Sequence, residues 1–228
     1  MKLGLISDIH GNSSALKVVL DCLIERVDRI LFLGDFAGYY SFVNECIEMM
    51  PADMVTSVRG NHDQILLDLL SSDSLPDDYQ RAFGSALKRS AEQLSVTSKE
   101  RLFALPVQLH LNIDGVSLAL IHGSPWDPLN GRVYPDFSDW NRFESCNDDI
   151  ILLGHTHYPM VKHIGRKLII NPGSVGQPRD GKKGACFAEL DISSRDVQFF
   201  RVSYDPRQVI EDARIHDPEN AYLVQVLQ

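Results

Sequence analysis

The first third of the chain alternates between two hydrophobic patterns. Apolar runs of strand length lie at residues 2–7, 29–33 and 53–58. Apolar residues recur every three or four positions, the spacing of a helix with one buried face, at 16–27, 42–50 and 62–70. This β-α-β-α-β-α order predicts a parallel sheet joined by right-handed crossovers.

After residue 104 the pattern changes to paired strands. Residues 107–123, VQLHLNIDGVSLALIHG, contain two apolar stretches around Asp114-Gly115, a dipeptide that favours a tight hairpin turn. Two further strand pairs are predicted at 160–163 with 167–170 and at 185–192 with 197–202. We therefore expect the second half of the chain to be antiparallel.

Two regions show no strand pattern. Residues 71–104 are polar and helix-prone, and we interpret them as a helical insertion over one edge of the sheet. Residues 205–228 have no clear pattern. Because no repeat, low-complexity segment or linker interrupts the chain, a single domain over 1–228 is predicted.

The composition is typical of a soluble globular protein, with 44% hydrophobic and 23% charged residues. No apolar run approaches the roughly 20 residues that a membrane helix needs. The net charge of −9 means that long-range attraction to nucleic acid or anionic lipid is not expected. The four cysteines form no C-x-x-C pair, which indicates buried free thiols in a reducing cytoplasm.

Polar residues directly follow each of five predicted strands. The five motifs are Asp8-Ile9-His10, Gly34-Asp35, Arg59-Gly60-Asn61-His62-Asp63, His122-Gly123 and Gly154-His155-Thr156-His157. In open α/β sheets, ligands bind at the carboxyl ends of the strands, so we expect these side chains to converge on one site.

The spacing within the motifs points to metal binding. In an extended segment, residues two apart face the same way, so His155 and His157 can share a site, as can Asp8 and His10. Imidazole and carboxylate without thiolate suit Mn, Fe, Zn, Ni or Co. Each motif alone is more often structural, but their joint position at five strand ends favours a metal centre. The remaining histidines are interpreted as structural or exposed; they are His110, His163 and His216.

Together, the five motifs resemble those of the calcineurin-like metallophosphoesterases. Residues 82–106 and the segment NPGSVGQPRDG at 171–181 are also similar to small bacterial, phosphodiesterase-type members of that family. The resemblance implies an α/β fold, a four-layer α/β/β/α sandwich with two central mixed sheets. It also implies two divalent transition metal ions, Mn²⁺ before Fe, Zn, Ni or Co, and hydrolysis of phosphate esters.

The resemblance further implies a role for each motif residue. The first ion would be bound by Asp8, His10 and His157. The second ion would be bound by Asn61, His122 and His155. Asp35 would bridge both ions, and a metal-bridging hydroxide would attack phosphorus. His62 matches the family's catalytic histidine that is not a ligand, and it would protonate the leaving oxygen or stabilise the transition state.

The second motif departs from the protein phosphatase branch of the family. That branch reads G-D-x-x-D-R-G, whereas this chain reads Gly34-Asp35-Phe36-Ala37-Gly38-Tyr39 and lacks the second aspartate, which orients the catalytic histidine. Asp63, which directly follows His62, has two equal interpretations: it takes over the orienting role, or it is an exposed residue at a helix start. Arg179 and Arg59 are candidates for binding substrate phosphate, with a structural ion pair as the alternative for Arg59.

These observations favour a phosphoesterase for small phosphodiester or nucleotide-type substrates. A dinucleoside polyphosphate hydrolase or a protein phosphatase is the alternative. A nuclease is disfavoured because the chain has no run of Lys and Arg. A non-catalytic scaffold of the same fold is disfavoured because every implied ligand and His62 are present.

Overall fold

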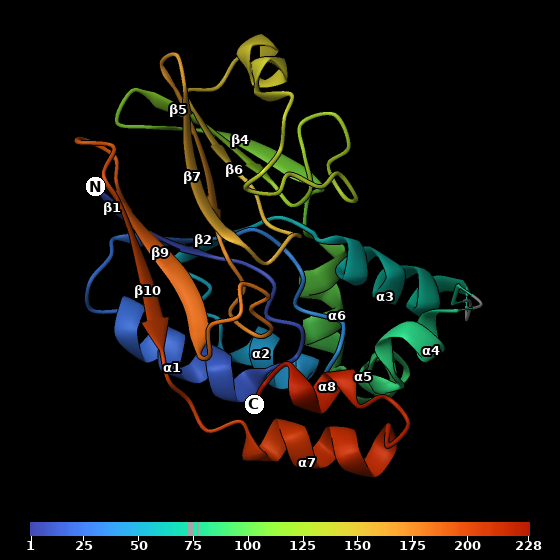
Figure 1. The fold of residues 1–228 in the computed structure, drawn as a ribbon. Helices are drawn as coiled ribbons and strands as arrows, with labels where there is room; N and C mark the ends of the chain where they lie inside the picture. Colours follow the sequence, from blue (N-terminus) through green and yellow to red (C-terminus); the bar gives the residue numbers. More distant parts are fainter. Residues whose placement is uncertain (73–74, 77) are drawn as a thin grey trace.

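Two five-stranded sheets lie face to face in the computed structural model, which describes residues 1–72, 75–76 and 78–228 (Figure 1). The strand order is β10-β9-β1-β2-β3 in the first sheet and β4-β5-β6-β8-β7 in the second. Both sheets contain parallel and antiparallel pairs. The predicted α/β fold with two central mixed sheets is confirmed.

The first sheet contains the three strands predicted at the start of the chain. Its strands are β1 (Lys2–Ile6), β2 (Arg29–Phe32), β3 (Val55–Ser57), β9 (Ala185–Asp191) and β10 (Val197–Val202). Strand β2 is parallel to both β1 and β3, as the alternating pattern predicts. The hairpin of β9 and β10 adds to the other edge, antiparallel to β1.

The second sheet corrects one expectation. Its strands are β4 (Gln108–Ile113), β5 (Val116–Ile121), β6 (Ile150–Leu152), β7 (Pro159–Ile164) and β8 (Lys167–Pro172). The β4-β5 hairpin turns at Asp114 and Gly115, whose φ angles of 53° and 83° suit a type I′ turn. However, β5, β6 and β8 are parallel to one another, so the second half is not wholly antiparallel. The long connection over 122–149 provides the crossover that a parallel pair requires.

Alternating residues of the strands divide the core into layers. In β2, Leu31 faces the second sheet, where it joins a cluster with Leu120 and Leu152. Its neighbours Ile30 and Phe32 face the opposite way, into a cluster covered by helices. The helices over this face include α1 (Ser13–Leu23) and α2 (Val43–Met49).

The outer face of the second sheet has a thinner cover. The loop after β5 lies over it and contains the short 3₁₀ helix η1 (Trp140–Ser145). Phe143 of this helix is fully buried against Ile121 and Ile151 of the sheet. In the described residues, the fourth layer is therefore a loop with one 3₁₀ helix.

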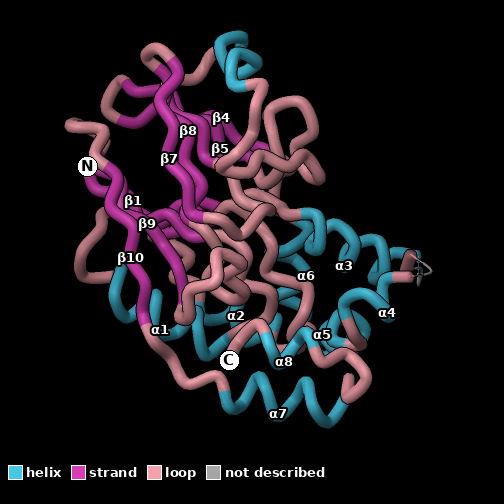
Figure 2. The backbone as a smooth tube through the Cα atoms, in the orientation of Figure 1, coloured by secondary structure: helices cyan, strands magenta, loops and turns pink. Residues whose placement is uncertain are grey.

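Helices also form the predicted insertion and the C-terminal segment. The insertion follows α3 (Asn61–Ser72) and contains α4 (Tyr79–Phe83), α5 (Ala86–Gln93) and α6 (Val96–Phe103). Residues 73, 74 and 77 of the predicted insertion lie outside the described residues. The C-terminal helices are α7 (Arg207–His216) and α8 (Tyr222–Gln225), and they lie beside the insertion (Figure 2). That 1–228 forms a single domain stays a prediction.

Ion pairs join the insertion to the C-terminal helices. The Arg89 guanidinium donates to both carboxylate oxygens of Asp212, at 2.8 and 3.0 Å. The backbone N–H of Ser85 donates to the carboxylate of Asp217 at 2.7 Å. Helix α5 is therefore fixed to α7 by charged side chains that are mostly shielded from solvent.

Two expectations from composition can be compared with the structure. The four cysteines are free; Cys46 and Cys186 are buried as expected, whereas Cys22 and Cys146 are only half-buried. Among the residues that the structure describes, no helix combines the length and the apolar character needed to cross a membrane.

Candidate metal centre

The five motifs meet where the strands of both sheets end. Asp8 follows β1 and Asp35 follows β2 in the first sheet, while His122 follows β5 and His155 follows β6 in the second. Asn61 begins α3, after β3. The convergence follows from topology, because the carboxyl ends of parallel strands lie on one side of a sheet.

The backbone at the site differs from the extended conformation assumed for the motifs. Positive φ angles, from 53° to 68°, occur at Asp8, His10, Asp35, His155 and His157. The extended conformation assumed for the paired residues is therefore wrong, because left-handed kinks direct their side chains. A non-glycine residue in this region costs about 1–3 kcal/mol and persists only where the surroundings enforce it. Such strain is typical of functional sites.

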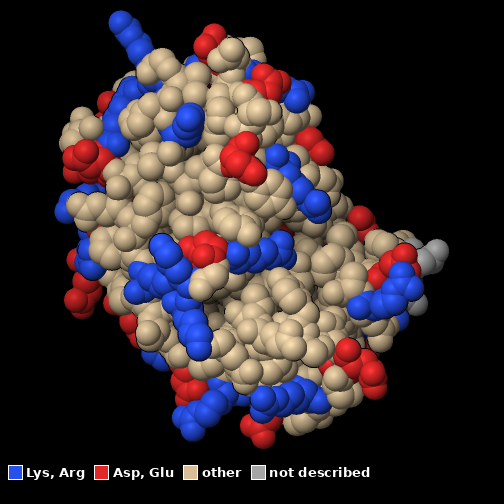
Figure 3. Space-filling view, in the orientation of Figure 1, with Lys and Arg blue, Asp and Glu red and all other residues tan. Residues whose placement is uncertain are grey.

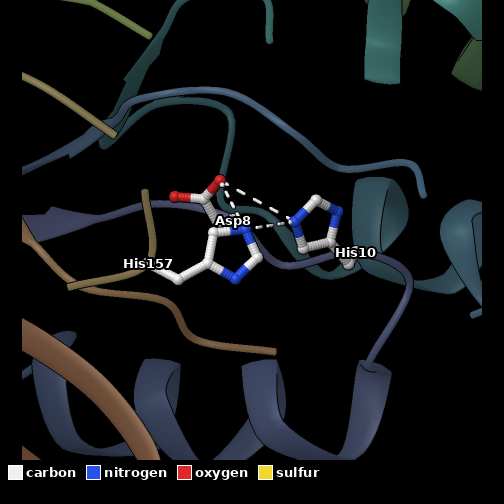
Figure 4. A group of neighbouring side chains, drawn as sticks. All are labelled: Asp8, His10 and His157. Atoms are coloured by element: carbon white, nitrogen blue, oxygen red, sulfur yellow. Dashed lines mark hydrogen bonds and ion pairs between the residues drawn. The ribbon is translucent and has the colours of Figure 1, made fainter. Parts of the chain in front are cut away.

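The first group of donor atoms comes from Asp8, His10 and His157. The Nε2 atoms of the two histidines lie 3.0 Å apart, and Asp8 Oδ1 lies 3.7 Å from His10 Nε2 and 3.4 Å from His157 Nε2. Figure 4 shows the three side chains pointing toward one another. All three are buried.

Backbone carbonyls fix which nitrogen of each ring carries the proton. His10 Nδ1 lies 2.7 Å from the Ala37 carbonyl, and His157 Nδ1 lies 2.6 Å from the Gln177 carbonyl. Each Nδ1 must donate, so each Nε2 presents a lone pair to the group. Burial lowers the pKa of both histidines well below the ordinary value, so a second proton is disfavoured. Two lone pairs and a carboxylate oxygen at these distances fit a cation between them.

The second group of donor atoms surrounds Asn61. Its Oδ1 lies 3.1 Å from His122 Nε2 and 2.9 Å from His155 Nδ1. The Leu33 carbonyl accepts from His122 Nδ1 at 2.7 Å, which directs Nε2 toward the group. Burial lowers the pKa of His122, but the carboxylates of Asp35 and Asp8 outweigh it and raise the pKa to about 9. This position therefore favours positive charge.

Asp35 lies between the two groups. Its Oδ2 is 3.3 Å from His122 Nε2 and 3.9 Å from His10 Nε2, while its Oδ1 accepts from the backbone N–H of His62 at 2.8 Å. Within the described part of the chain, Asp8 Oδ1 and Asp35 Oδ2 are buried without a hydrogen-bond partner. Buried carboxylate oxygens without a partner are costly unless a cation compensates them. The residues present therefore fit divalent cation binding.

Asp63 corrects a second expectation. It is fully buried rather than exposed, and its carboxylate accepts from the backbone N–H groups of Asp35, Ala37 and Gly60 at 2.8–3.0 Å. Burial and the charge of Asp35 raise its pKa to about 6. Asp63 thus holds the loop that carries Asp35, a role invisible in sequence because its partners are backbone groups of distant segments.

Asp63→Asn is expected to weaken metal binding by about 10–100-fold, the usual range for a residue that supports a ligand. The amide has one oxygen acceptor instead of two, so at least one of the three backbone N–H groups loses its partner. Calorimetric titration with Mn²⁺ or Zn²⁺ measures the effect. Asp68→Asn, an exposed change on the same helix, is the control. Equal affinities of the two variants would contradict the role given to Asp63.

His62 lies beside the first group, but its ring has no backbone carbonyl as partner, in contrast to the rings of His10 and His157. One of its ring nitrogens is within 4.8 Å of donor atoms of His10 and Asp35. Its Nδ1 lies 2.6 Å from the hydroxyl of Tyr79, a residue of the insertion that the sequence did not single out. Tyr79 comes from a polar segment with no motif, so no sequence signal indicated it.

The two predicted substrate-binding arginines occupy different surroundings. Arg179 donates to the Tyr39 hydroxyl at 2.6 Å and to Gln177 Oε1 at 3.1 Å, and its guanidinium lies 5.6 Å from the centre of the Tyr39 ring. The Tyr39 ring is itself 4.8 Å from that of His10, which places Arg179 beside the first group.

Arg59 is bound to helices instead. It donates to Gln64 at 2.7 Å and to the Phe103 carbonyl at 3.2 Å, which joins α3 to α6. Its role in substrate binding stays a prediction. By contrast, Arg132, which the sequence analysis missed, is exposed with Nε 3.4 Å from His155 Nε2.

The other histidines lie outside the site. His110 Nδ1 is 2.9 Å from a carboxylate oxygen of Asp148, and His216 Nδ1 is 3.0 Å from the Asp212 carbonyl. His163 is exposed. This agrees with their interpretation as structural or exposed.

Comparison with known proteins identifies the family. The family model described as the calcineurin-like phosphoesterase superfamily domain matches residues 1–195. An uncharacterised protein of Methanocaldococcus jannaschii is 34% identical over 228 residues, covering 92% of this chain and 90% of its own. Phosphodiesterase YfcE of Escherichia coli is 27% identical over 203 residues, with 84% and 88% covered. The structure of a metallophosphoesterase from Sphaerobacter thermophilus, 30% identical, superimposes with a TM-score of 0.80 over 100% of this chain and 98% of its own. The resemblance found in the motifs is thereby confirmed, and the chain belongs to the calcineurin-like phosphoesterase superfamily.

Proposed function

We propose that the protein is a dinuclear metal-dependent phosphoesterase that hydrolyses small phosphodiester or nucleotide-type substrates. One observation carries this proposal: among the described residues, Asp8 Oδ1 and Asp35 Oδ2 are buried without hydrogen-bond partners, close to the Nε2 lone pairs of His157 and His10. Family membership and the phosphodiesterase relative support the reaction class.

The proposed ligands follow the two groups of donor atoms. Asp8, His10 and His157 would hold the first ion. Asn61, His122 and His155 would hold the second ion. Asp35 would contribute to both sites. Imidazole, carboxylate and amide oxygen suit Mn²⁺, with Fe, Zn, Ni and Co as alternatives. The positive charge of two divalent ions would exceed the negative charge of the Asp8 and Asp35 carboxylates. The remaining positive charge would attract a phosphate group.

When bound, such ions activate water at neutral pH and polarise the phosphoryl oxygens. The protein supplies the remaining functions through its own residues. His62, at the edge of the first group, donates a hydrogen bond to an oxygen of the reacting phosphate. Arg179, held by Tyr39 and Gln177, binds phosphate oxygens from the same side. Arg132, whose guanidinium lies beside His155, binds phosphate oxygens from the other side of the site.

The surface favours small substrates over macromolecules. The net charge is −9, and basic and acidic side chains are interspersed on the face drawn in Figure 3. A groove for nucleic acid would instead need clustered Lys and Arg. The missing second-motif aspartate disfavours a phosphoprotein substrate. A dinucleoside polyphosphate remains the alternative small substrate.

The metal-loaded protein is expected to have a higher kcat/KM for an aryl phosphodiester or a dinucleoside polyphosphate than for a phosphoserine peptide. The reason is that neither the second motif nor the charge suits phosphoprotein recognition. Steady-state kinetics on all three substrates measures this, and chelator-treated protein corrects for contaminating activity. A clear preference for the phosphopeptide would overturn the proposed substrate class.

A further inference from the structure

The hydroxyl of Tyr79, in helix α4, is hydrogen-bonded to one ring nitrogen of His62. Tyr79 Oη lies 2.6 Å from His62 Nδ1, and only 3% of Tyr79 and 6% of His62 are exposed. Four residues later in the same helix, the ring of Phe83 meets His62 edge-on, with ring centres 4.9 Å apart. Helix α4 therefore presents one hydrogen-bonding ring and one packing ring to His62.

The direction of this hydrogen bond follows from the protons available. A phenol has one proton to donate, and a neutral imidazole has one N–H and one lone pair. If the Tyr79 hydroxyl donates to Nδ1, both groups are satisfied and the imidazole proton is on Nε2. If Nδ1 donated instead, a buried hydroxyl proton would be left without an acceptor, which is unfavourable. Burial also raises the pKa of Tyr79 well above its ordinary value, so the phenol keeps its proton.

No aspartate can take this orienting role from the second motif. In the protein phosphatase pattern, the orienting aspartate stands at the position of Gly38. Gly38 has a φ of 141°, and a Cβ atom there would collide with the imidazole of His10. The nearby acid, Asp63, accepts from backbone N–H groups of Asp35 and Ala37. Among the described residues, the side chain that orients His62 through a hydrogen bond is therefore Tyr79.

We propose, on the basis of the function proposed above, that Tyr79 is a positioning residue: its hydroxyl donates to Nδ1 of His62, so that the Nε2–H of His62 is the group that donates to the phosphoryl oxygens. The hydrogen bond fixes the plane of the His62 ring, because it is made only while the Nδ1 lone pair points at the Tyr79 hydroxyl. The Nε2–H is thereby held in one direction, where it can stabilise charge that develops on oxygen.

Tyr79→Phe tests this role because it removes the hydroxyl and keeps the ring. We expect kcat to fall by about 10–100-fold, with KM and metal content unchanged. Tyr40→Phe is the matched control, since the buried Tyr40 hydroxyl donates to the Leu223 carbonyl, and it should leave kcat unchanged. In a His62→Ala background, Tyr79→Phe should have no further effect. A loss no larger than that of Tyr40→Phe, or one that persists with His62→Ala, would overturn the proposal.

A measurement on the metal-free protein tests the tautomer directly. NMR of protein labelled with ¹⁵N-histidine shows which ring nitrogen carries the proton, and His62→Gln assigns the signals. We expect the Nε2–H form for His62 in the unmodified chain and loss of this single form in Tyr79→Phe. An Nδ1–H form in the unmodified chain would overturn the role of Tyr79 while leaving metal-dependent hydrolysis intact. Failure of the proposed function would instead appear as absence of that hydrolysis.

Discussion

Asp35→Asn is expected to lose both metal ions and nearly all hydrolysis. One carboxylate oxygen of Asp35 accepts the N–H of His62, and the other lies between His122 and His10. An amide can serve only one side, because its NH₂ group must face either the His62 N–H or the metal centre. The rate should fall by at least about 10³-fold, since removing even one donor that stabilises a transition state costs about 10²–10³-fold.

Elemental analysis after dialysis measures the metal content of this variant. Asp114→Asn is the matched control: it makes the same chemical change at the β4-β5 turn, where the side chain is 59% exposed. The control should keep up to two transition metal ions per chain. If the unmodified protein carried no metal and a chelator left its activity untouched, the dinuclear proposal would be wrong. Incubation with chelator must be long enough to empty a tight site.

His62→Ala is expected to lower kcat by about 10²–10³-fold while the metal content stays near that of the unmodified protein. His62 lies beside the first group, but its Nδ1 is bonded to Tyr79 instead of to a backbone carbonyl. His122→Ala and His155→Ala are the comparison variants, and both should lose metal. Loss of metal from His62→Ala would show that His62 is a ligand.

The leaving group separates two modes of action for His62. If His62 donates a hydrogen bond and keeps its proton, His62→Ala should lose a similar factor on a nitrophenyl ester and on an alkyl ester. A nitrophenolate departs readily without a proton, whereas an alkoxide does not. A much larger loss on the alkyl ester would therefore indicate proton transfer from His62 to the leaving oxygen instead of a hydrogen bond to the phosphoryl group.

The meeting of the five motifs could be predicted from the sequence because its signals are local. Each motif directly follows an apolar strand, and parallel strands end on the same side of a sheet, so the approach of Asp8 to Asp35 follows from connectivity. The conformation of these residues was not predictable in the same way. Their left-handed φ angles are imposed by tertiary contacts, and aspartate and histidine carry no local preference strong enough to indicate them.

The supporting residues were missed for a different reason. Asp63 and Tyr79 act through partners in other segments, and neither stands in a pattern that marks such a role. The parallel pairing of β5 with β6 was missed because a long loop, rather than a helix, makes the crossover. The C-terminal helices were missed because α7 is mostly polar and α8 has only four residues. Helix α7 is held by a distant partner, Arg89.

The ion pair between Arg89 of α5 and Asp212 of α7 has a consequence for how the protein responds to change. Asp212 lies beyond residue 195, where the match to the family model ends. Tyr79 and Phe83 reach His62 from the insertion that Arg89 belongs to. A substitution at Asp212 should therefore alter turnover through the orientation of His62 without touching any of the proposed metal ligands. Speed of turnover and affinity for metal are thus separately adjustable properties of this chain.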